Sequence, residues 1–428
     1  MAAFPEMNAI VINTGTELLL GDVLNTHIAF IAQEILPIGL RITLQQTVPD
    51  GPAIEGALRD AFSRAEIIFV TGGLGPTTDD ITREVTAALL KLQLRHDAGV
   101  MEEITSRAAQ RGFRLTDRIP RQAMVPEGAV VLRNNHGTAP GLYLREHINA
   151  GQPSPHIFLL PGPPRELRPM FVERVIPLLR TIVPAELQSE CRIYRIVGMG
   201  ESLVEEAIGK QLLEMADIEL GYCSHVGQVD LRIIGSNAAI AQADALISSR
   251  LGESIFSRHG ASLEETIVTL LRDANQTIAV AESCTGGFLA HRITNVSGAS
   301  AVFKAGYVTY ANEAKTRELG IEATIISEHG AVSEPVARAM ALSALKRNGV
   351  TFALSTTGIA GPAGGTDEKP VGTVFIGLSS SAGTEVKRFY FPEDRQTFKQ
   401  LATQNALEML RQAVLREYVS NTGSRRSD

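Results

Sequence analysis

The stretch Thr277-Ile-Ala-Val-Ala-Glu-Ser-Cys-Thr-Gly-Gly-Phe288 decides the fold of the C-terminal part of the chain. A β-rich apolar run stops at Ser283, and two glycines then open a helical pattern. The segment therefore predicts a strand, a tight turn and a helix, with the Ser283 hydroxyl beside backbone N–H groups at the helix start. Such groups are unpaired and partly positive, so they suit an anion or the oxyanion of an acyl-transfer intermediate. Ser283 is interpreted as a nucleophile, and the alternative is that Ser283 or Thr285 only caps the helix.

The same α/β pattern continues on both sides of this segment and predicts a C-terminal domain over residues 256–420. Strands are expected at 277–281, 301–309, 352–356 and 372–378, and helices at 264–273, 335–346 and 398–417. The polar residues 421–428 are expected to form a flexible tail.

The preceding sequence predicts two further domains. In residues 1–172, short apolar strands at 8–13, 67–71 and 156–160 alternate with helical patterns, which is typical of a parallel sheet covered on both faces. Residues 173–255 contain two alternating strands, at 192–197 and 228–234, and indicate a small α+β connector. The expected fold class is therefore α/β, with two sandwich-type domains joined by this connector.

Composition excludes several classes of protein. Forty basic against forty-seven acidic residues give a formal charge of -7, which argues against broad binding to nucleic acid. Cys191, Cys223 and Cys284 lack the spacing of a zinc site or a disulfide framework, so a reducing cytoplasm is expected. The N-terminus has no signal-peptide pattern and no later run is apolar over the length of a bilayer, so secretion and membrane insertion are not expected.

Lys315 is a candidate base for the Ser283 hydroxyl. It follows the predicted strand at 301–309, where the chain breaks and turns into a helix. If the ammonium group were desolvated at the sheet edge, its pKa would fall and the neutral amine could accept a proton. Tyr310 could relay or orient that proton. The alternative is that Lys315 is a solvated lysine on a helix face.

A third loop of the C-terminal domain, Ser355-Thr-Thr-Gly-Ile-Ala-Gly-Pro-Ala-Gly-Gly365, follows an apolar strand and is rich in glycine. Gly358 and Gly361 would let backbone N–H groups approach a phosphate or carboxylate. Arg395 is a further candidate phosphate contact. A flexible surface loop and a surface charge are the respective alternatives.

Five blocks in this domain resemble the C-terminal domain of the CinA family, whose active members hydrolyse the carboxamide of nicotinamide mononucleotide. The blocks are AESCTGG at 281–287, YANEAK at 310–315, HGAVSE at 329–334, TGIAGP at 357–362 and KPVGT at 369–373. The resemblance implies that Ser283 is the nucleophile, Lys315 the base, Tyr310 an assisting hydroxyl, and that Thr357 lies near the reacting group.

The residues themselves agree with that implied chemistry. A serine and lysine pair is a recurring arrangement for attack on an amide and needs no cofactor. The backbone of Cys284, Thr285, Gly286 and Gly287 would stabilise the oxyanion. Cys284 is a rival nucleophile, but it would need a partner that lowers its pKa.

The N-terminal domain contains its own candidate site in Val70-Thr-Gly-Gly-Leu-Gly-Pro-Thr-Thr-Asp-Asp-Ile-Thr82. Gly72, Gly73 and Gly75 would let phosphate oxygens approach the backbone, and a carboxylate of Asp79 or Asp80 would hold a divalent cation such as Mg²⁺. The alternative is that these aspartates cap the following helix.

Together with the loops at 13–22, 134–141 and 160–166, this segment resembles the MogA/MoaB-like molybdopterin-binding domain found at the N-terminus of CinA. The activity implied in that branch is metal-dependent cleavage of the pyrophosphate of ADP-ribose. Asp80 and Asp50 match the two acidic positions of the site, and Glu17 is an additional metal candidate. A pterin is the alternative ligand, because glycine loops with acidic neighbours do not distinguish the two.

The leading hypothesis is a cytoplasmic chain with two enzyme activities in pyridine-nucleotide recycling. It acts on nicotinamide mononucleotide and ADP-ribose, and the resemblance suggests a homodimer. A second hypothesis is a competence or DNA-damage associated protein that binds nucleotides, catalyses little and contacts a recombination protein rather than nucleic acid. A third is a molybdenum-cofactor enzyme acting on adenylated pterin.

Overall fold

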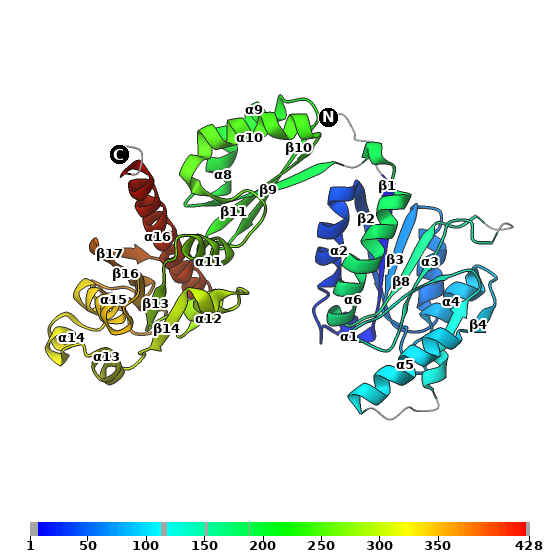
Figure 1. Cartoon of the computed structure of the whole chain (residues 1–428), viewed down its shortest axis with the longest axis horizontal. Helices are drawn as coiled ribbons and strands as arrows, with labels where there is room; N and C mark the ends of the chain where they lie inside the picture. The colour runs from blue at the N-terminus through cyan, green and yellow to red at the C-terminus, as the bar shows by residue number, and fades with distance from the viewer. Residues whose placement is uncertain (1–6, 113–117, 150–152, 188, 425–428) are drawn as a thin grey trace. The chain divides into compact units, whose positions relative to one another are not determined.

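The computed structural model describes residues 7–112, 118–149, 153–187 and 189–424. The chain divides into two compact units, Met1–Cys191 and Arg192–Asp428. Figure 1 follows their helices and strands in chain order. The architecture is mixed α/β in both units, as the sequence predicts.

The first unit is built on a six-stranded sheet, ordered β2 (Leu40–Val48), β1 (Met7–Thr14), β3 (Ile67–Thr71), β8 (His156–Leu160), β7 (Gly141–Leu144) and β6 (Val130–Leu132). The first four strands are parallel, whereas β7 and β6 are antiparallel to their neighbours. The expectation of a parallel sheet is therefore wrong for this edge. In the described chain no helix separates β6, β7 and β8, and a parallel pairing would require such a crossover.

Helices cover both faces of this sheet. On one face lie α3 (Ala53–Ala61), α4 (Thr82–Leu89) and α5 (Ala98–Arg111), packed on alternate strand residues such as Ile10 and Ile68. On the other lie α2 (His27–Ile35), α6 (Pro164–Met170) and α7 (Ile176–Ile182), packed on residues such as Val11 and Phe69. Because α7 belongs to this core, the first unit extends past the expected boundary at residue 172.

The second unit begins with a small α+β module. Its sheet has the order β10 (Ile218–His225), β11 (Gln228–Gly235), β9 (Glu190–Val197) and β12 (Ile255–Ser257). One helical layer, α8 (Glu201–Val204), α9 (Lys210–Leu213) and α10 (Asn237–Leu251), supplies the buried residues Val204, Leu212 and Ile247 to its core.

The larger part of the second unit is a five-stranded sheet, ordered β14 (Phe303–Val308), β13 (Ile278–Glu282), β15 (Phe352–Gly358), β16 (Thr373–Ser380) and β17 (Gly383–Tyr390). Strands β14, β13 and β15 are parallel, and β16 and β17 are antiparallel. The carboxyl end of the central strand β13 leads directly into Ser283. The edge strand β17 was not expected, because its exposed polar residues carry little hydrophobic signal.

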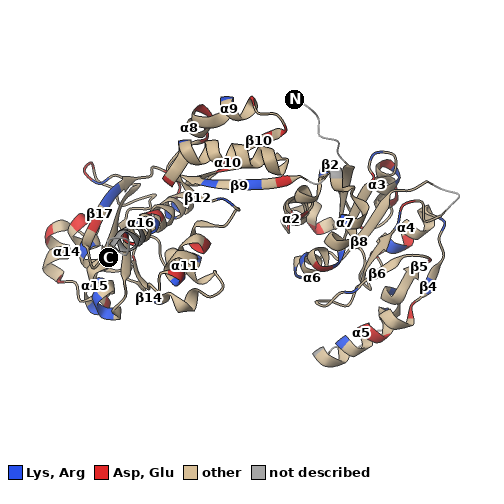
Figure 2. Ribbon diagram, turned by 45° about the horizontal axis from the view of Figure 1, so that its top comes forward, with Lys and Arg blue, Asp and Glu red and all other residues tan. Residues whose placement is uncertain are grey.

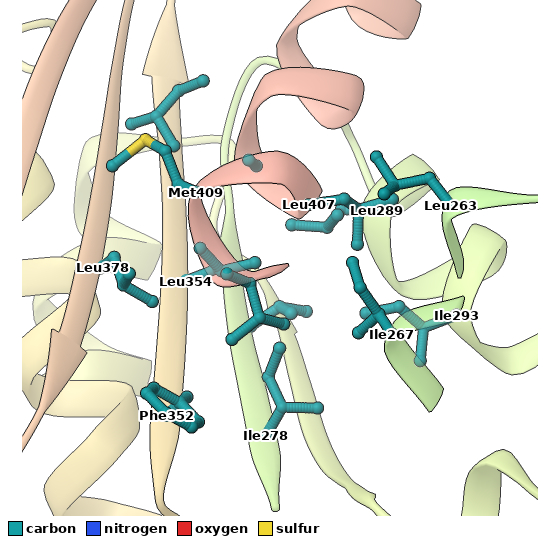
Figure 3. Packing of buried hydrophobic residues seen from close by; sticks show 14 of the residues in the cluster. Leu263, Ile267, Ile278, Leu289, Ile293, Phe352, Leu354, Leu378, Leu407 and Met409 are labelled. Atoms are coloured by element: carbon teal, nitrogen blue, oxygen red, sulfur yellow. The ribbon is translucent and has the colours of Figure 1, made fainter. Parts of the chain in front are cut away.

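Each face of this sheet is covered by three helices. Figure 3 shows α11 (Leu263–Asp273), α12 (Phe288–Thr294) and α16 (Arg395–Ser424) packed on one face through Ile267, Leu289 and Leu407. On the other face lie α13 (Asn312–Leu319), α14 (Ala323–His329) and α15 (Glu334–Asn348). Helix α16 runs past its expected end at 417 into the expected tail, whose last residues, 425–428, lie outside the described residues.

Charges of both signs are distributed over both units. Figure 2 shows Lys and Arg beside Asp and Glu on helices of each unit, in keeping with forty basic and forty-seven acidic residues. In the part of the chain that the structure describes, no helix has the length and apolar character needed to cross a bilayer.

Candidate functional site

The structure brings Ser283 and Lys315 together at the carboxyl end of β13. Lys315 lies on the first turn of α13, and its Nζ is 3.1 Å from Ser283 Oγ. Both side chains are buried, with 8% of Ser283 and 1% of Lys315 exposed. A lysine on a surface helix face would not have this environment, so the solvated alternative is wrong.

Two backbone carbonyls complete the surroundings of the amine. Lys315 Nζ donates to Thr309 O at 2.8 Å and to Tyr310 O at 3.4 Å. A neutral amine has two N–H groups and one lone pair, so these two carbonyls leave the lone pair for the Ser283 hydroxyl. Burial lowers the pKa of Lys315 from its ordinary value of 10.5, while Cys284 and Glu313 oppose this effect. Three surrounding oxygens accommodate either form of the amine, and the burial that lowers the pKa favours the uncharged base.

The start of α12 is capped by a residue that sequence reasoning missed, Glu282. This carboxylate is fully buried and accepts hydrogen bonds from the N–H groups of Gly287 (3.0 Å), Leu289 (3.0 Å) and Ala290 (2.8 Å). It also accepts from the Thr285 hydroxyl at 2.6 Å. A signal was available, because an acidic residue at the end of a strand directly before a helix start complements the helix dipole. Thr285 is therefore held inside the turn, and Glu282 rather than Ser283 is the cap.

This capping determines which N–H groups of the turn remain available. Ser283 N donates to Thr356 O, and Gly286 N donates to Ser283 O. Within the described chain, only the N–H groups of Cys284 and Thr285 in the segment 283–290 have no acceptor. The expected contributions of Gly286 and Gly287 to an oxyanion site are therefore wrong, because their N–H groups are bound to Ser283 O and to Glu282. Two donors directly after a serine nucleophile are what an oxyanion site needs.

The surroundings of the Cys284 thiol do not suit a nucleophile. Its thiol is buried, and burial raises its pKa to about 12. Since the thiolate is the nucleophilic form, Cys284 is a structural thiol of the core. It contributes its backbone N–H group, not its sulfur, to the site.

Tyr310 and Arg395 are neighbours at the rim. Tyr310 is 60% exposed, and its hydroxyl accepts a 2.8 Å hydrogen bond from Arg395 Nη2. Arg395 Nη1 also donates to Gly361 O at 3.0 Å. The phenol therefore contacts Arg395, and only the backbone carbonyl of Tyr310 contacts Lys315.

The remaining predicted residues of this loop have structural partners. Thr357 is buried, and its hydroxyl donates to Ala331 O at 2.7 Å. A side chain on Gly358 would collide with the backbone of Thr373, and one on Gly361 with Val371. Close packing alone thus accounts for both glycines, without a ligand.

Lys399 is a second cation beside Arg395, and the sequence did not predict it. It lies one helical turn after Arg395 on α16, and its Nζ is 3.7 Å from the position of a Cβ built on Gly286. Gly286, Val308 and Tyr310 are exposed on this face of the unit, near the buried Ser283. This face combines a buried dyad with two cations at its rim.

In the first unit, the four loops singled out in the sequence line one cavity of about 540 Å³. They are the loops after β1, β3 and β8 and the loop before β7. The cavity lies at the carboxyl ends of the parallel strands, where open α/β sheets place ligands. The glycine loop is closely packed, because side chains on Gly72, Gly73 and Gly75 would collide with Thr14, Thr82 and Asp80.

Four predicted acidic residues line this cavity: Glu17, Asp50, Asp79 and Asp80. Asp50 Oδ2 accepts from the N–H group of Thr16 at 3.1 Å, and Asp80 Oδ2 accepts from that of Thr77 at 2.9 Å. Among the described residues, neither Asp79 nor Asp80 caps α4 (Thr82–Leu89), because no side chain caps the helix at Ile81 and neither carboxylate bonds to the N–H groups of its first turn. Arg121 supports the Asp80 turn by donating to Thr77 O at 2.9 Å and Asp80 O at 3.3 Å.

These carboxylates fit a hard divalent cation as oxygen donors. Within the described ranges, no three His, Cys, Asp or Glu side chains are grouped closely enough to form a metal site by themselves. Magnesium ions are often held by one or two carboxylates together with substrate phosphates. The donor set therefore fits a cation that binds with a phosphorylated ligand.

Family models match three consecutive parts of the chain. The matches are "Probable molybdopterin binding domain" at residues 10–181, "Damage-inducible protein CinA KH domain" at 191–257, and "CinA C-terminal domain" at 260–414. They fall on the first unit, the α+β module and the five-stranded α/β part.

Relatives match over nearly the whole length. A CinA-like protein of Akkermansia muciniphila is 43% identical over 96% of this chain and 98% of its own length. A CinA-like protein of Kosmotoga olearia is 40% identical over 96% and 99%. Among solved structures, a competence/damage inducible protein from Agrobacterium tumefaciens is 39% identical over 36% of this chain and 93% of its own, with a TM-score of 0.34.

Proposed function

Since the chain belongs to the CinA family, we propose that its C-terminal part hydrolyses the carboxamide of nicotinamide mononucleotide to nicotinate mononucleotide and ammonia. The observation that carries this proposal is the 3.1 Å contact between Lys315 Nζ and Ser283 Oγ, beside two free N–H groups. A serine with an uncharged lysine as its base is an established arrangement for attack on an amide.

The first half of the reaction forms an acyl-enzyme. Neutral Lys315 takes the proton of the Ser283 hydroxyl while Oγ bonds to the carboxamide carbon. The carbonyl oxygen becomes an oxyanion, which accepts hydrogen bonds from the N–H groups of Cys284 and Thr285. The carbon–nitrogen bond then breaks, and the leaving nitrogen takes the proton from the Lys315 ammonium and departs as ammonia.

The second half hydrolyses the ester on Ser283. Lys315, again neutral, removes a proton from water as the water oxygen attacks the ester carbon. The bond to Oγ breaks, Ser283 recovers its proton from Lys315, and nicotinate mononucleotide is released. Arg395 and Lys399 at the rim are suited to the substrate phosphate, since a monophosphate near neutral pH carries negative charge.

We propose for the first unit the cleavage of the ADP-ribose pyrophosphate with a divalent cation. The support is a cavity that brings the glycine loop and the Asp50 and Asp80 carboxylates together. A divalent cation held there would neutralise the pyrophosphate and polarise its phosphorus–oxygen bonds. The chain's own part is to bind the phosphates at the loop of Gly72 and Gly73 and to orient the carboxylates through Thr16 and Thr77.

One chromatographic experiment tests both activities. The whole chain is incubated with Mg²⁺ and each nucleotide, and the products are separated. Nicotinate mononucleotide with ammonia, and AMP with ribose 5-phosphate, are the expected products. In Asp80→Ala the second pair should disappear while the first persists. Unchanged nucleotides would contradict the proposal and favour a protein that binds nucleotides without turnover.

A further inference from the structure

The cavity of the first unit contains a polar pair that neither the carboxylates nor the glycine loop explains. Asn25 and His27 both line it, at the start of α2. Among the described residues, Asn25 Nδ2 and His27 Nδ1 have no hydrogen-bond partner, although both atoms are buried. His27 is only 7% exposed, so an unpartnered ring nitrogen in it is unfavourable unless a ligand satisfies it.

The hydrogen-bonding role of His27 is fixed by its other nitrogen. His27 Nε2 is 2.6 Å from Gly162 O. A carbonyl only accepts, so Nε2 carries the proton. Burial lowers the pKa of His27 and so favours the neutral ring, while the bond to Gly162 opposes this effect and Arg168 adds to it. In the neutral ring Nδ1 has a lone pair and no proton, which makes it an unpaired acceptor of a residue that lines the cavity.

The orientation of Asn25 is fixed in the same way. Its Oδ1 accepts the N–H group of His27 at 3.1 Å. The amide therefore presents Nδ2, a donor, to the cavity. One acceptor and one donor are thus held two residues apart on one wall of the site.

The chemistry of this pair indicates an uncharged partner. A phosphate oxygen would be repelled by the Nδ1 lone pair, whereas a hydroxyl both donates and accepts one hydrogen bond. The position also favours a sugar over a base. His27 contacts Gly162, and a Cβ built on Gly162 would lie 3.5 Å from Gly72 Cα, so the pair adjoins the phosphate loop.

We propose that Asn25 and His27 form a ribose-hydroxyl subsite, in which the hydroxyl donates to His27 Nδ1 and accepts from Asn25 Nδ2. This assignment rests on the proposed nucleotide function of the first unit. It makes the pair a determinant of specificity for ribonucleotides over deoxy analogues. A site built to bind a hydroxyl rejects a ligand that lacks it, because its own polar atoms then stay unpaired.

The test compares binding of ADP-ribose with five analogues in the presence of Mg²⁺, so that each of the five ribose hydroxyls of ADP-ribose is removed once. Affinity is measured by calorimetry, or from initial rates where the nucleotide is cleaved. Wild type should bind one analogue about tenfold more weakly than ADP-ribose, as expected for one buried hydrogen-bonded hydroxyl. IDP-ribose differs from ADP-ribose only at the edge of the base. The ratio of the affinities for these two nucleotides should therefore not depend on His27.

His27→Gln separates recognition from folding. Its amide N–H group can replace the bond to Gly162, but it offers no acceptor at the position of Nδ1. In this variant the tenfold preference should fall to about onefold. Asn25→Ser, whose hydroxyl can still accept from the His27 N–H group, should show the same loss. Unchanged melting temperatures confirm that both variants are folded.

Four outcomes contradict the assignment. Wild type that binds the analogues of all five ribose hydroxyls as tightly as ADP-ribose has no hydroxyl subsite. A preference that persists in both variants lies elsewhere in the cavity. Loss of discrimination between ADP-ribose and IDP-ribose in His27→Gln, with the hydroxyl preference intact, would assign the pair to the base. Binding without cleavage in wild type would rule out the proposed pyrophosphatase activity and leave the hydroxyl preference measurable. Absence of any binding would rule out both the activity and the hydroxyl subsite.

Discussion

The two candidate sites present opposite charges to the anionic ligands proposed for them. Both are proposed to bind phosphorylated nucleotides, yet the cavity of the first unit is lined by Glu17, Asp50, Asp79, Asp80 and Glu166, and no Lys or Arg is among the described residues that line it. The site at Ser283 has cations at its rim, Arg395 and Lys399, and its one buried carboxylate is fully hydrogen bonded. We therefore expect the first site to use a metal ion to hold an anion, whereas the second presents positive charge from its own side chains.

Chelation of metal ions should separate the two sites most strongly. With excess EDTA the cleavage of ADP-ribose should fall by roughly 10³-fold or more, because the carboxylates then face an uncompensated pyrophosphate. Ammonia release from nicotinamide mononucleotide should change less than about twofold, since no step of that reaction uses a metal. Both rates are measured on one protein sample. Equal sensitivity of the two activities to EDTA would remove the contrast.

Lys315→Met tests the uncharged base in the second site. The substitution keeps the length of the side chain and removes the amine, so kcat/KM should fall by about 10³-fold. In wild type the rate should rise with pH through the lowered pKa of Lys315, because only the deprotonated amine accepts a proton. Lys399→Met is the matched control and should leave this pH dependence in place. A pH-independent wild-type rate would contradict the role of Lys315.

Glu282→Gln tests whether the buried cap also positions the nucleophile. The amide would replace one acceptor oxygen with an NH2 group, which would oppose either the N–H group of Ala290 or those of Gly287 and Leu289. We expect kcat to fall by about 10- to 100-fold with little change in KM, and the unfolding free energy to fall by about 2 kcal/mol.

Glu264→Gln on α11 is the control for that substitution. It weakens the partly buried ion pair with Arg292, which joins α11 to α12 and lies away from Ser283. This variant should melt at a lower temperature with kcat near that of wild type. If both variants lose stability alike and both keep kcat, Glu282 has only a structural role.

Arg395→Ala should have the smallest effect. Loss of one cation at an exposed rim should raise KM for nicotinamide mononucleotide by about tenfold at similar kcat, and added salt should reduce the difference. Nicotinamide riboside, which lacks the phosphate, supplies the control. Its KM should not change, and an equal increase for the riboside would assign Arg395 to the support of Tyr310 instead.

The sequence predicted the strands best, and the reason is physical. The buried strands Ile67–Thr71 and His156–Leu160 are continuous apolar runs, and both appear with the expected bounds. The exposed edge strand β17 and the antiparallel edge of the first sheet have weak patterns and depend on connections and neighbours. The ends of α16 were also missed, since polar residues give no periodic signal there.

The site residues that were predicted differ from those that were missed for a similar reason. Positions at strand ends, such as Ser283 and Asp80, could be found because a turn follows each strand in the sequence. The roles of Lys399 and His27 depend on partners far along the chain, such as the bond from His27 to Gly162. Glu282 differs, because its partners lie within eight residues and its position before a helix start was a usable signal. The glycines at 358 and 361 show the reverse error, since close packing and ligand approach leave the same sequence pattern.

The most direct test of the central claim compares Ser283→Ala with Cys284→Ala in ammonia release from nicotinamide mononucleotide. The two substitutions are adjacent, and each removes one candidate nucleophile while keeping the backbone N–H groups. The account predicts that Ser283→Ala loses roughly 10³-fold or more of the rate, whereas Cys284→Ala stays within about threefold of wild type. An active Ser283→Ala beside an inactive Cys284→Ala would contradict it.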